Sequence, residues 1–197
     1  MKRLLFISES PLEKFENKYY AKDTWIKFPL ELSKHYDLTI LTPVYQSKNK
    51  PSEKNKWPIS KANAGIAELP NYSGFGSLFK KILIQYGVYR KKIKEEIIAS
   101  DIVAIRLPSP ITLFFYLTIV FSKKPIVLFV GGNIETQVDQ YIESTGIKRM
   151  LYEIGINIIS FIEKKLASKS NFILSALISQ SLLFNGHILY VELVSKT

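Results

Sequence analysis

Six short apolar runs, each of strand length, recur along the chain between segments with helical periodicity. They lie at 3–8, 37–43, 64–70, 101–108, 125–130 and 171–176. Strands that are apolar throughout are buried on both faces, as happens in parallel sheets covered by helices. Because strand and helix alternate and crossovers are right-handed, each helix returns to the sheet. The sequence therefore predicts an α/β protein: a Rossmann-like, three-layer α/β/α domain with a mostly parallel sheet of about six strands.

The segments between these runs have apolar residues three or four positions apart, which is typical of helices. Helices are expected at 25–36, 77–100, 109–124 and 146–168, and a last one begins at 179–184. Ser109 and Pro110 are residue types favoured at a helix N-cap and first turn. No linker divides the chain, so we expect one domain over residues 1–197.

Composition excludes several classes of function. The chain has no cysteine, which removes disulfides, thiolate chemistry and zinc–sulfur sites, and its two histidines are far apart. No glycine-rich dinucleotide or P-loop motif occurs, which argues against nicotinamide enzymes and P-loop NTPases. We therefore expect no cofactor and no metal. The apolar start of the chain is too short for a signal peptide, and no apolar run approaches the roughly 20 residues of a membrane span. A cytoplasmic location is expected.

The net charge of +10 at pH 7 is the strongest compositional signal, because it favours anionic partners. The predicted helix at 77–100 concentrates cations between its apolar positions, which suits an anionic membrane surface. A simple solvated lysine face remains the alternative. Aromatic stacking modules for nucleic acid are not recognisable, so no nucleic-acid partner is expected. The residues predicted to face the membrane are Lys80, Lys81, Arg90, Lys91, Lys92 and Lys94.

Polar residues follow three of the predicted strands, where ligands bind in parallel sheets. The candidates for substrate binding are Ser8, Glu9, Ser10, Arg106, Gly131, Gly132 and Asn133. The glycines allow close backbone approach to an anion, or else form only a tight turn. Glu9 is either a ligand contact or a solvated loop carboxylate. Arg106, at the end of an apolar strand, needs a partner, which is a ligand or a residue of the first loop.

Glu135 is the candidate general base, because its carboxylate follows the glycines and lies four residues before Asp139. The alternative is that both carboxylates sit in the first turn of a helix, where the helix dipole favours them.

The order of these elements resembles the N-terminal half of a GT-B glycosyltransferase, in particular the family-4 type of bacterial polysaccharide and glycolipid assembly. The segments that carry the resemblance are "RLLFISES", "DLTILTP", "AELPNYSG", "DIVAIRLPSP" and "KKPIVLFVGGN". The last two are similar to the family patterns D-x-V-x-x-R-x-P and K-P-x-x-x-x-x-V-G-D, although Asn133 stands where the family has aspartate. The match covers about residues 1–175.

The resemblance implies the acceptor-binding half of a hexosyltransferase, which transfers a sugar from a nucleotide-sugar to a hydroxyl of a glycan or lipid-linked acceptor. The loops at 8–11 and 131–133 would face the acceptor cleft, with Arg106 beneath it. In this family the donor is held mainly by a C-terminal domain, for which residues 176–197 leave no room. We therefore expect this chain to need a second domain or glycosyltransferase subunit, to be inactive alone, and to lie at the inner face of the plasma membrane.

Two other hypotheses about the function remain open. The first is a non-catalytic Rossmann-like protein that docks onto a partner or a membrane. The second is a soluble enzyme that acts on a small phosphorylated substrate.

Overall fold

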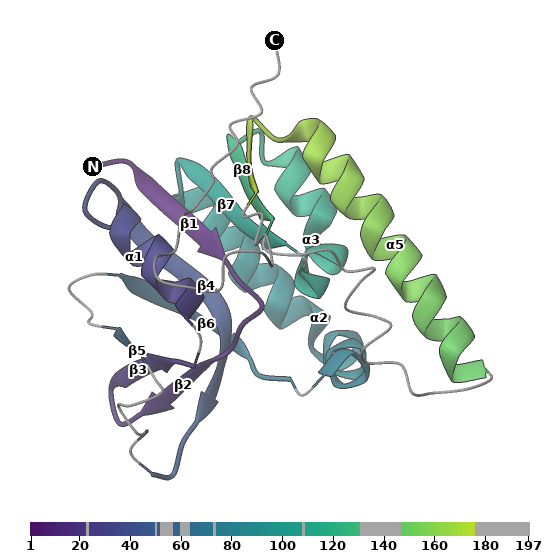
Figure 1. Ribbon diagram of the computed structural model, residues 1–197, viewed down its shortest axis with the longest axis horizontal. Coiled ribbons are helices and arrows are strands. Elements are labelled where there is room, and N and C mark those ends of the chain that lie inside the picture. The colour runs from purple at the N-terminus through teal and green to yellow at the C-terminus, as the bar shows by residue number, and fades with distance from the viewer. Residues whose placement is uncertain are drawn as a thin grey trace, which may run out of the picture.

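The computed structural model describes residues 1–22, 24–49, 51, 57–59, 64–72, 74–107, 109–130 and 147–175. Strands and helices alternate over much of this length (Figure 1). The strands are β1 (Arg3–Ile7), β2 (Leu12–Phe15), β3 (Lys18–Ala21), β4 (Asp37–Gln46), β5 (Trp57–Ile59), β6 (Gly65–Pro70), β7 (Ile102–Leu107), β8 (Ile126–Val130) and β9 (Phe172–Ser175). The helices are η1 (Thr24–Ile26), α1 (Lys27–Leu32), α2 (Gly74–Ala99), α3 (Pro110–Phe121) and α5 (Ile147–Lys169).

The predicted α/β class is confirmed, and so are the positions of all six predicted strands, which are β1, β4, β6, β7, β8 and β9. Four predicted helices are also present, although the first is shorter than expected and ends at Leu32. The helix predicted to begin at 179–184 lies outside the described residues.

β1 lies at the centre of the sheet, parallel to β4 on one side and to β7 on the other, with Leu5 opposite Thr39 and Val103. β6 pairs in parallel with β4, while β8 and β9 continue in parallel from β7. These six strands thus have the order β6-β4-β1-β7-β8-β9. The chain moves outward from β1 to β4 and β6, returns through α2, and moves outward in the other direction from β7. The direction reverses between β1 and β7.

The whole sheet is mixed, which corrects the expectation of a mostly parallel sheet. The segment after β1, expected to be a loop, forms an antiparallel hairpin of β2 and β3, and β5 pairs antiparallel with β3. β2 pairs with Val44–Gln46, directly beyond the part of β4 that pairs with β1. The hairpin turn holds Glu16 at a left-handed φ of 52°, where glycine or asparagine is usual. A glutamate at this position gives little sequence signal for a turn.

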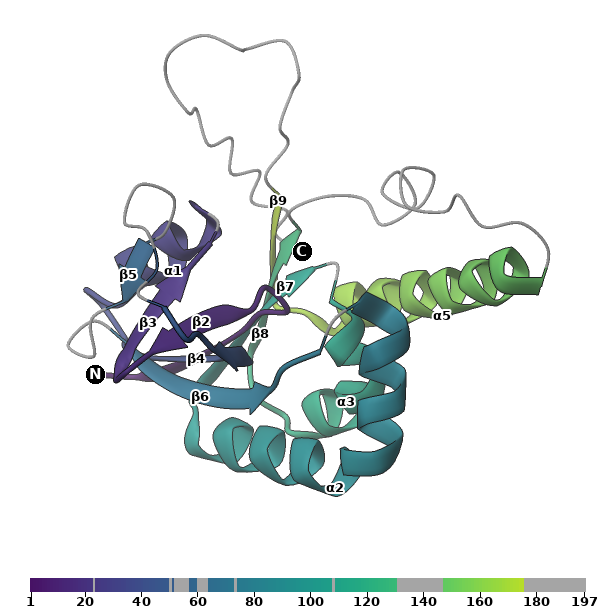
Figure 2. The ribbon, with the colours of Figure 1, turned by 90° about the horizontal axis from the view of Figure 1, so that it is seen from below.

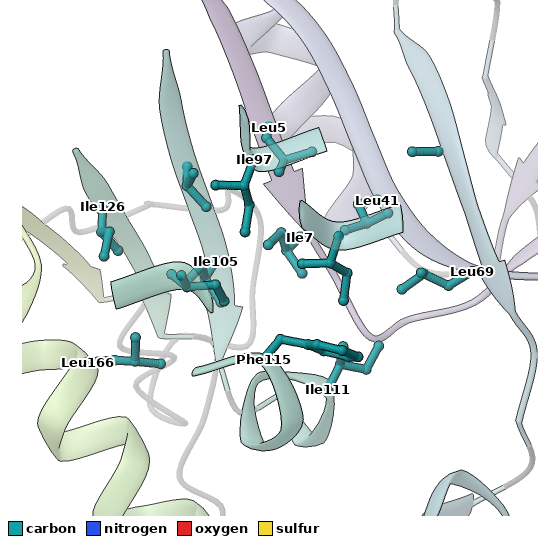
Figure 3. Packing of buried hydrophobic residues seen from close by; sticks show 14 of the residues in the cluster. Leu5, Ile7, Leu41, Leu69, Ile97, Ile105, Ile111, Phe115, Ile126 and Leu166 are labelled. Carbon is teal, nitrogen blue, oxygen red and sulfur yellow. The ribbon is translucent and has the colours of Figure 1, made fainter. Parts of the chain in front are cut away.

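The side chains of β1 alternate between two hydrophobic clusters, one on each face of the sheet. Leu5 and Ile7 pack in a cluster with Ile97 of α2 and Phe115 of α3 (Figure 3). Leu4 and Phe6 pack in the other, which includes Ile26 of η1. Helices α2, α3 and α5 thus cover one face, while α1 lies on the other (Figure 2). Burial of each such side chain contributes about 1.5–3 kcal/mol.

Two helices show a distinct local feature, at the start of α3 and inside α2. Ser109 precedes α3 with an extended backbone, and Pro110 follows in the first turn, as predicted. α2 is interrupted at Gln85, whose φ of −118° and ψ of 20° are not helical, and its two segments run in different directions (Figure 2). Among the described residues, none of the helices combines the length and the apolar character that crossing a membrane requires.

Candidate functional site

The carboxyl ends of β1 and β7 lie side by side at the place where the direction of the strand order reverses. In open α/β sheets ligands commonly bind at such a place, beyond the carboxyl ends of the strands. The loop after β1 carries Ser8, Glu9 and Ser10, and Arg106 lies one residue before the end of β7. The sequence prediction thus named four residues that the fold brings to one end of the sheet.

Ser8 and Ser10 fix the shape of the first loop. Ser8 is fully buried, its N–H donates to the Leu41 carbonyl at 3.0 Å, and its Oγ accepts from the Ser10 N–H at 3.2 Å. The Ser10 carbonyl in turn accepts a hydrogen bond from Thr42 Oγ1 at 2.8 Å. Ser8 therefore fixes the shape of this loop, and its predicted contact with substrate stays a prediction.

Arg106 is held by residues of both the first loop and η1. Its Nη1 donates to Ser10 Oγ at 2.5 Å, and its Cζ lies 5.5 Å from the centroid of the Trp25 ring. A guanidinium over an aromatic face gains cation–π attraction, and one hydrogen bond leaves further donors of its fork for other groups. The predicted contact between Arg106 and the first loop is thus present, through a hydroxyl.

Glu9 has the most perturbed carboxyl group of this site. Partial burial raises the pKa of Glu9 from 4.5 to about 7, because desolvation disfavours the charged form. The Arg106 guanidinium opposes this effect on the pKa, and the Glu163 carboxylate adds to it. At neutral pH about half of the molecules therefore carry Glu9 as the ionised carboxylate. The ionised form is the one that can take a proton from a hydroxyl.

Glu163 of α5 was not among the predicted residues. Its carboxylate accepts a hydrogen bond from the Ser109 N–H at the start of α3, and burial raises the pKa of Glu163. Its Oε1 is buried and has no hydrogen-bond partner in the described part of the chain. The helical spacing places Glu163 on the face of the buried Ile159 and Leu166, four and three residues away, but it does not show what the carboxylate contacts.

Tyr72, two residues after β6, is the second group that the sequence did not reveal. Its hydroxyl is buried and finds no hydrogen-bond partner among the described residues. Burial holds the pKa of Tyr72 above its usual range, and the negative charge of Glu9 contributes to the shift. Buried hydroxyls without partners are uncommon and mark places where a ligand or water supplies the missing hydrogen bond. Together, Glu9, Ser10, Tyr72, Arg106 and Glu163 form what we call the strand-end cluster.

The other predicted site residues cannot be placed in this cluster. Gly131, Gly132, Asn133 and Glu135 lie outside the described residues, so their roles remain predictions.

The six cations predicted to face a membrane differ in their surroundings. Lys80, Arg90, Lys91 and Lys94 are exposed. Lys81 donates to the Asn71 carbonyl, and the Lys92 ammonium lies 3.2 Å from Glu96 one turn along α2. Four of the six are therefore available to a large anionic partner.

The described residues contain no cluster of three or more metal-ligating side chains. The strand-end cluster instead offers two carboxyl groups, a phenol and a guanidinium, which together suit hydrogen bonding to a neutral, hydroxyl-rich ligand. No protein-family model and no curated protein matches this chain.

Proposed function

We propose that this chain is the acceptor-binding half of a GT-B glycosyltransferase, which transfers a sugar from a nucleotide-sugar to the hydroxyl of a glycan or lipid-linked acceptor. The observation that carries the proposal is the position of the strand-end cluster at the reversal of the β6-β4-β1-β7-β8-β9 order. The order of these six parallel strands is like that of doubly wound sheets, in which ligands bind at that position. The family resemblance of the sequence supplies the reaction type.

In this proposal Glu9 is the general base, in place of Glu135. Its carboxylate takes the proton of the acceptor hydroxyl as the hydroxyl oxygen forms a bond to the anomeric carbon of the donor. The bond between that carbon and the diphosphate oxygen breaks, and the nucleoside diphosphate leaves with the bonding electrons. A pKa of about 7 suits this role, because the base is partly ionised at neutral pH yet basic enough to accept a proton.

The remaining residues of the cluster would orient the acceptor. Arg106 donates hydrogen bonds to acceptor oxygens, while Tyr72 and Glu163 use the buried oxygens that have no partner in the described part of the structure. Correct orientation of a reacting hydroxyl lowers the barrier to reaction by removing the entropy cost of bringing the groups together.

Acceptor binding can be measured on this chain without a donor domain. We expect saturation-transfer NMR to detect binding of at least one of the methyl glycosides of glucose, galactose, mannose and N-acetylglucosamine. Replacement Arg106→Ala is expected to weaken that binding about tenfold or more, since hydrogen bonds to charged groups contribute about 1.5–3 kcal/mol. Glu9→Gln should retain binding, because glutamine keeps the shape of the side chain.

The matched controls are Arg90→Ala and Glu95→Gln, whose side chains are exposed on α2, away from the strand ends. Both variants should bind like the unmodified chain. Absence of binding to every glycoside, or equal loss of binding in Arg90→Ala and Arg106→Ala, would contradict the proposal.

The second candidate function is a non-catalytic docking domain, and one observation favours it. Large apolar side chains remain exposed on α2, α3 and α5, including Ile84, Phe121 and Phe161. Under this alternative, Glu9→Gln and Arg106→Ala leave the cellular function of the protein intact, whereas a glycosyltransferase half loses it.

A further inference from the structure

Helices α2, α3 and α5 form an outer layer that carries most of the exposed apolar surface. Among the described residues, all large hydrophobic side chains that are exposed lie on these three helices except Met1 and Trp57. Scattered apolar side chains are normal on a protein surface, but a layer of them indicates an interaction surface.

α5 has apolar residues on two opposite faces. Ile159 and Leu166 are buried against the body of the protein. On the other face lies a ladder with spacings of four, four and three residues, which places its members in one row along the helix. The ladder consists of Met150, Ile154, Ile158 and Phe161, with exposed fractions between 47% and 61%. Figure 2 shows that α5 extends well beyond the edge of the sheet.

α3 repeats this arrangement on a smaller scale. Phe115 and Ile119 are buried in the core, whereas Leu117 and Phe121 are 63% and 76% exposed on the opposite side of the helix. α3 and α5 lie side by side in both views of the fold (Figures 1 and 2). The apolar surface is therefore shared by neighbouring helices.

Cations surround this apolar surface. Lys164, Lys165 and Lys169 are exposed at the C-terminal end of the ladder, and Lys165 Nζ lies 5.6 Å from the centroid of the Phe161 ring. α2 adds its exposed cations to the same layer of helices. Among the described side chains of these three helices, the exposed carboxylates are Glu95 and Glu153, and the exposed cations outnumber them.

We infer that this outer layer docks onto an anionic lipid bilayer. The ladder of α5 enters the boundary between headgroups and acyl chains, and the lysines beside it meet the headgroup phosphates. A second copy of the chain fits less well, because its own lysines would face these lysines. The inference goes beyond glycosyl transfer and does not depend on it, because docking requires neither a donor nor an acceptor.

Vesicle flotation tests the inference with the full chain. The chain should float with vesicles of phosphatidylcholine that contain phosphatidylglycerol and should remain unbound with phosphatidylcholine alone. Replacement of the ladder residues, Ile154→Ser with Phe161→Ser, should weaken binding to the anionic vesicles. The double charge reversal Lys164→Glu with Lys165→Glu should weaken it at least about tenfold, since each cation near an anionic surface contributes about 1 kcal/mol.

The matched control is Lys18→Glu with Lys22→Glu, which changes the net charge equally at two exposed positions near β3, outside the layer. This control should float like the unmodified chain, and circular dichroism should show that all variants fold. The inference is overturned if the chain floats with neither vesicle, or if the control loses binding as strongly as the Lys164 and Lys165 variant. It is also overturned if the ladder variant binds fully, or if light scattering shows a dimer that the ladder variant dissociates.

Discussion

The pKa of Glu9 is set by burial and by two neighbouring charged groups. Burial raises its pKa most strongly, the Arg106 guanidinium lowers it, and the Glu163 carboxylate raises it further. Perturbed carboxyl groups in a crevice are typical of functional sites, because a group that binds or transfers protons at neutral pH needs such an environment.

The pKa of Glu9 can be measured directly. Carbon-detected NMR titration of labelled glutamate should give Glu9 a pKa of about 7. Arg106→Ala should raise this pKa further, since it removes a positive charge, and Glu163→Gln should lower it, since it removes a negative one. Glu95→Gln, on the exposed side of α2, should leave it unchanged. A pKa near 4.5 in the unmodified chain would refute this account of Glu9.

The same shift predicts how stability depends on pH. Glu9 has a higher pKa in the folded chain than in the unfolded chain, so the folded state holds an extra proton between about pH 4.5 and 7. Its contribution to stability is therefore present below this window and is lost as the pH rises through it. Glu9→Gln should remove this loss and raise the free energy of unfolding at about pH 8. The effect of the substitution on the free energy of unfolding should be more favourable at about pH 8 than at about pH 4, by up to about 3 kcal/mol.

Urea unfolding of both proteins at the two pH values measures this difference. Glu95→Gln serves as the control and should show no such dependence. An equal effect of Glu9→Gln at both pH values would show that the carboxyl group is not desolvated.

At the scale of elements, the six core strands could be predicted because their apolar runs are local. Leu4 to Ile7, for example, are buried on both faces of the sheet, and for this reason they form a continuous apolar run in the sequence. The β2–β3 hairpin could not be predicted, since its turn uses Glu16 and its pairing with β4 joins segments about thirty residues apart. The kink at Gln85 lies two residues before Gly87, but a single glycine within a helical pattern does not by itself predict a kink.

The site was predictable only in part for a related reason. Ser8, Glu9, Ser10 and Arg106 follow or end strands, so the position of each in its element indicated the site. Tyr72 lies in the segment after β6, and Glu163 lies on the core face of α5. Their presence at the site depends on how elements far apart in the sequence pack together. Their roles become visible only through buried oxygens without partners in the described structure.

The two faces of α5 give a prediction at this scale. Leu166→Ala should lower the free energy of unfolding by about 2–5 kcal/mol, because Leu166 is fully buried and its truncation leaves a cavity. Ile158→Ala should change it by less than about 0.5 kcal/mol, because Ile158 is 47% exposed on the opposite face. Urea denaturation measures both. Strong destabilisation by Ile158→Ala would mean that the ladder packs within the protein rather than facing a partner.

At the scale of the whole molecule, the two proposed surfaces have different locations and different chemistry. The strand-end cluster lies at the carboxyl ends of β1 and β7, whereas the cationic, apolar layer consists of the outer faces of α2, α3 and α5 (Figure 2). A protein that docks through this layer would keep the strand ends accessible to an acceptor held at a membrane. Glu163 joins α5 to the strand-end cluster, but Ile154 and Phe161 of the ladder are exposed on another face of this helix, so the ladder variant alters the second surface without removing a residue of the first.

Sugar transfer should be measured with radiolabelled nucleotide-sugars on this chain combined with a nucleotide-sugar-binding GT-B domain. We expect transfer by the combination and none by the donor domain without this chain. Glu9→Gln should lower the rate about 10²–10⁴-fold, as loss of a general base does, while acceptor binding persists. Full transfer by Glu9→Gln, or no transfer by the unmodified combination, would show that Glu9 is not the base of a glycosyltransferase.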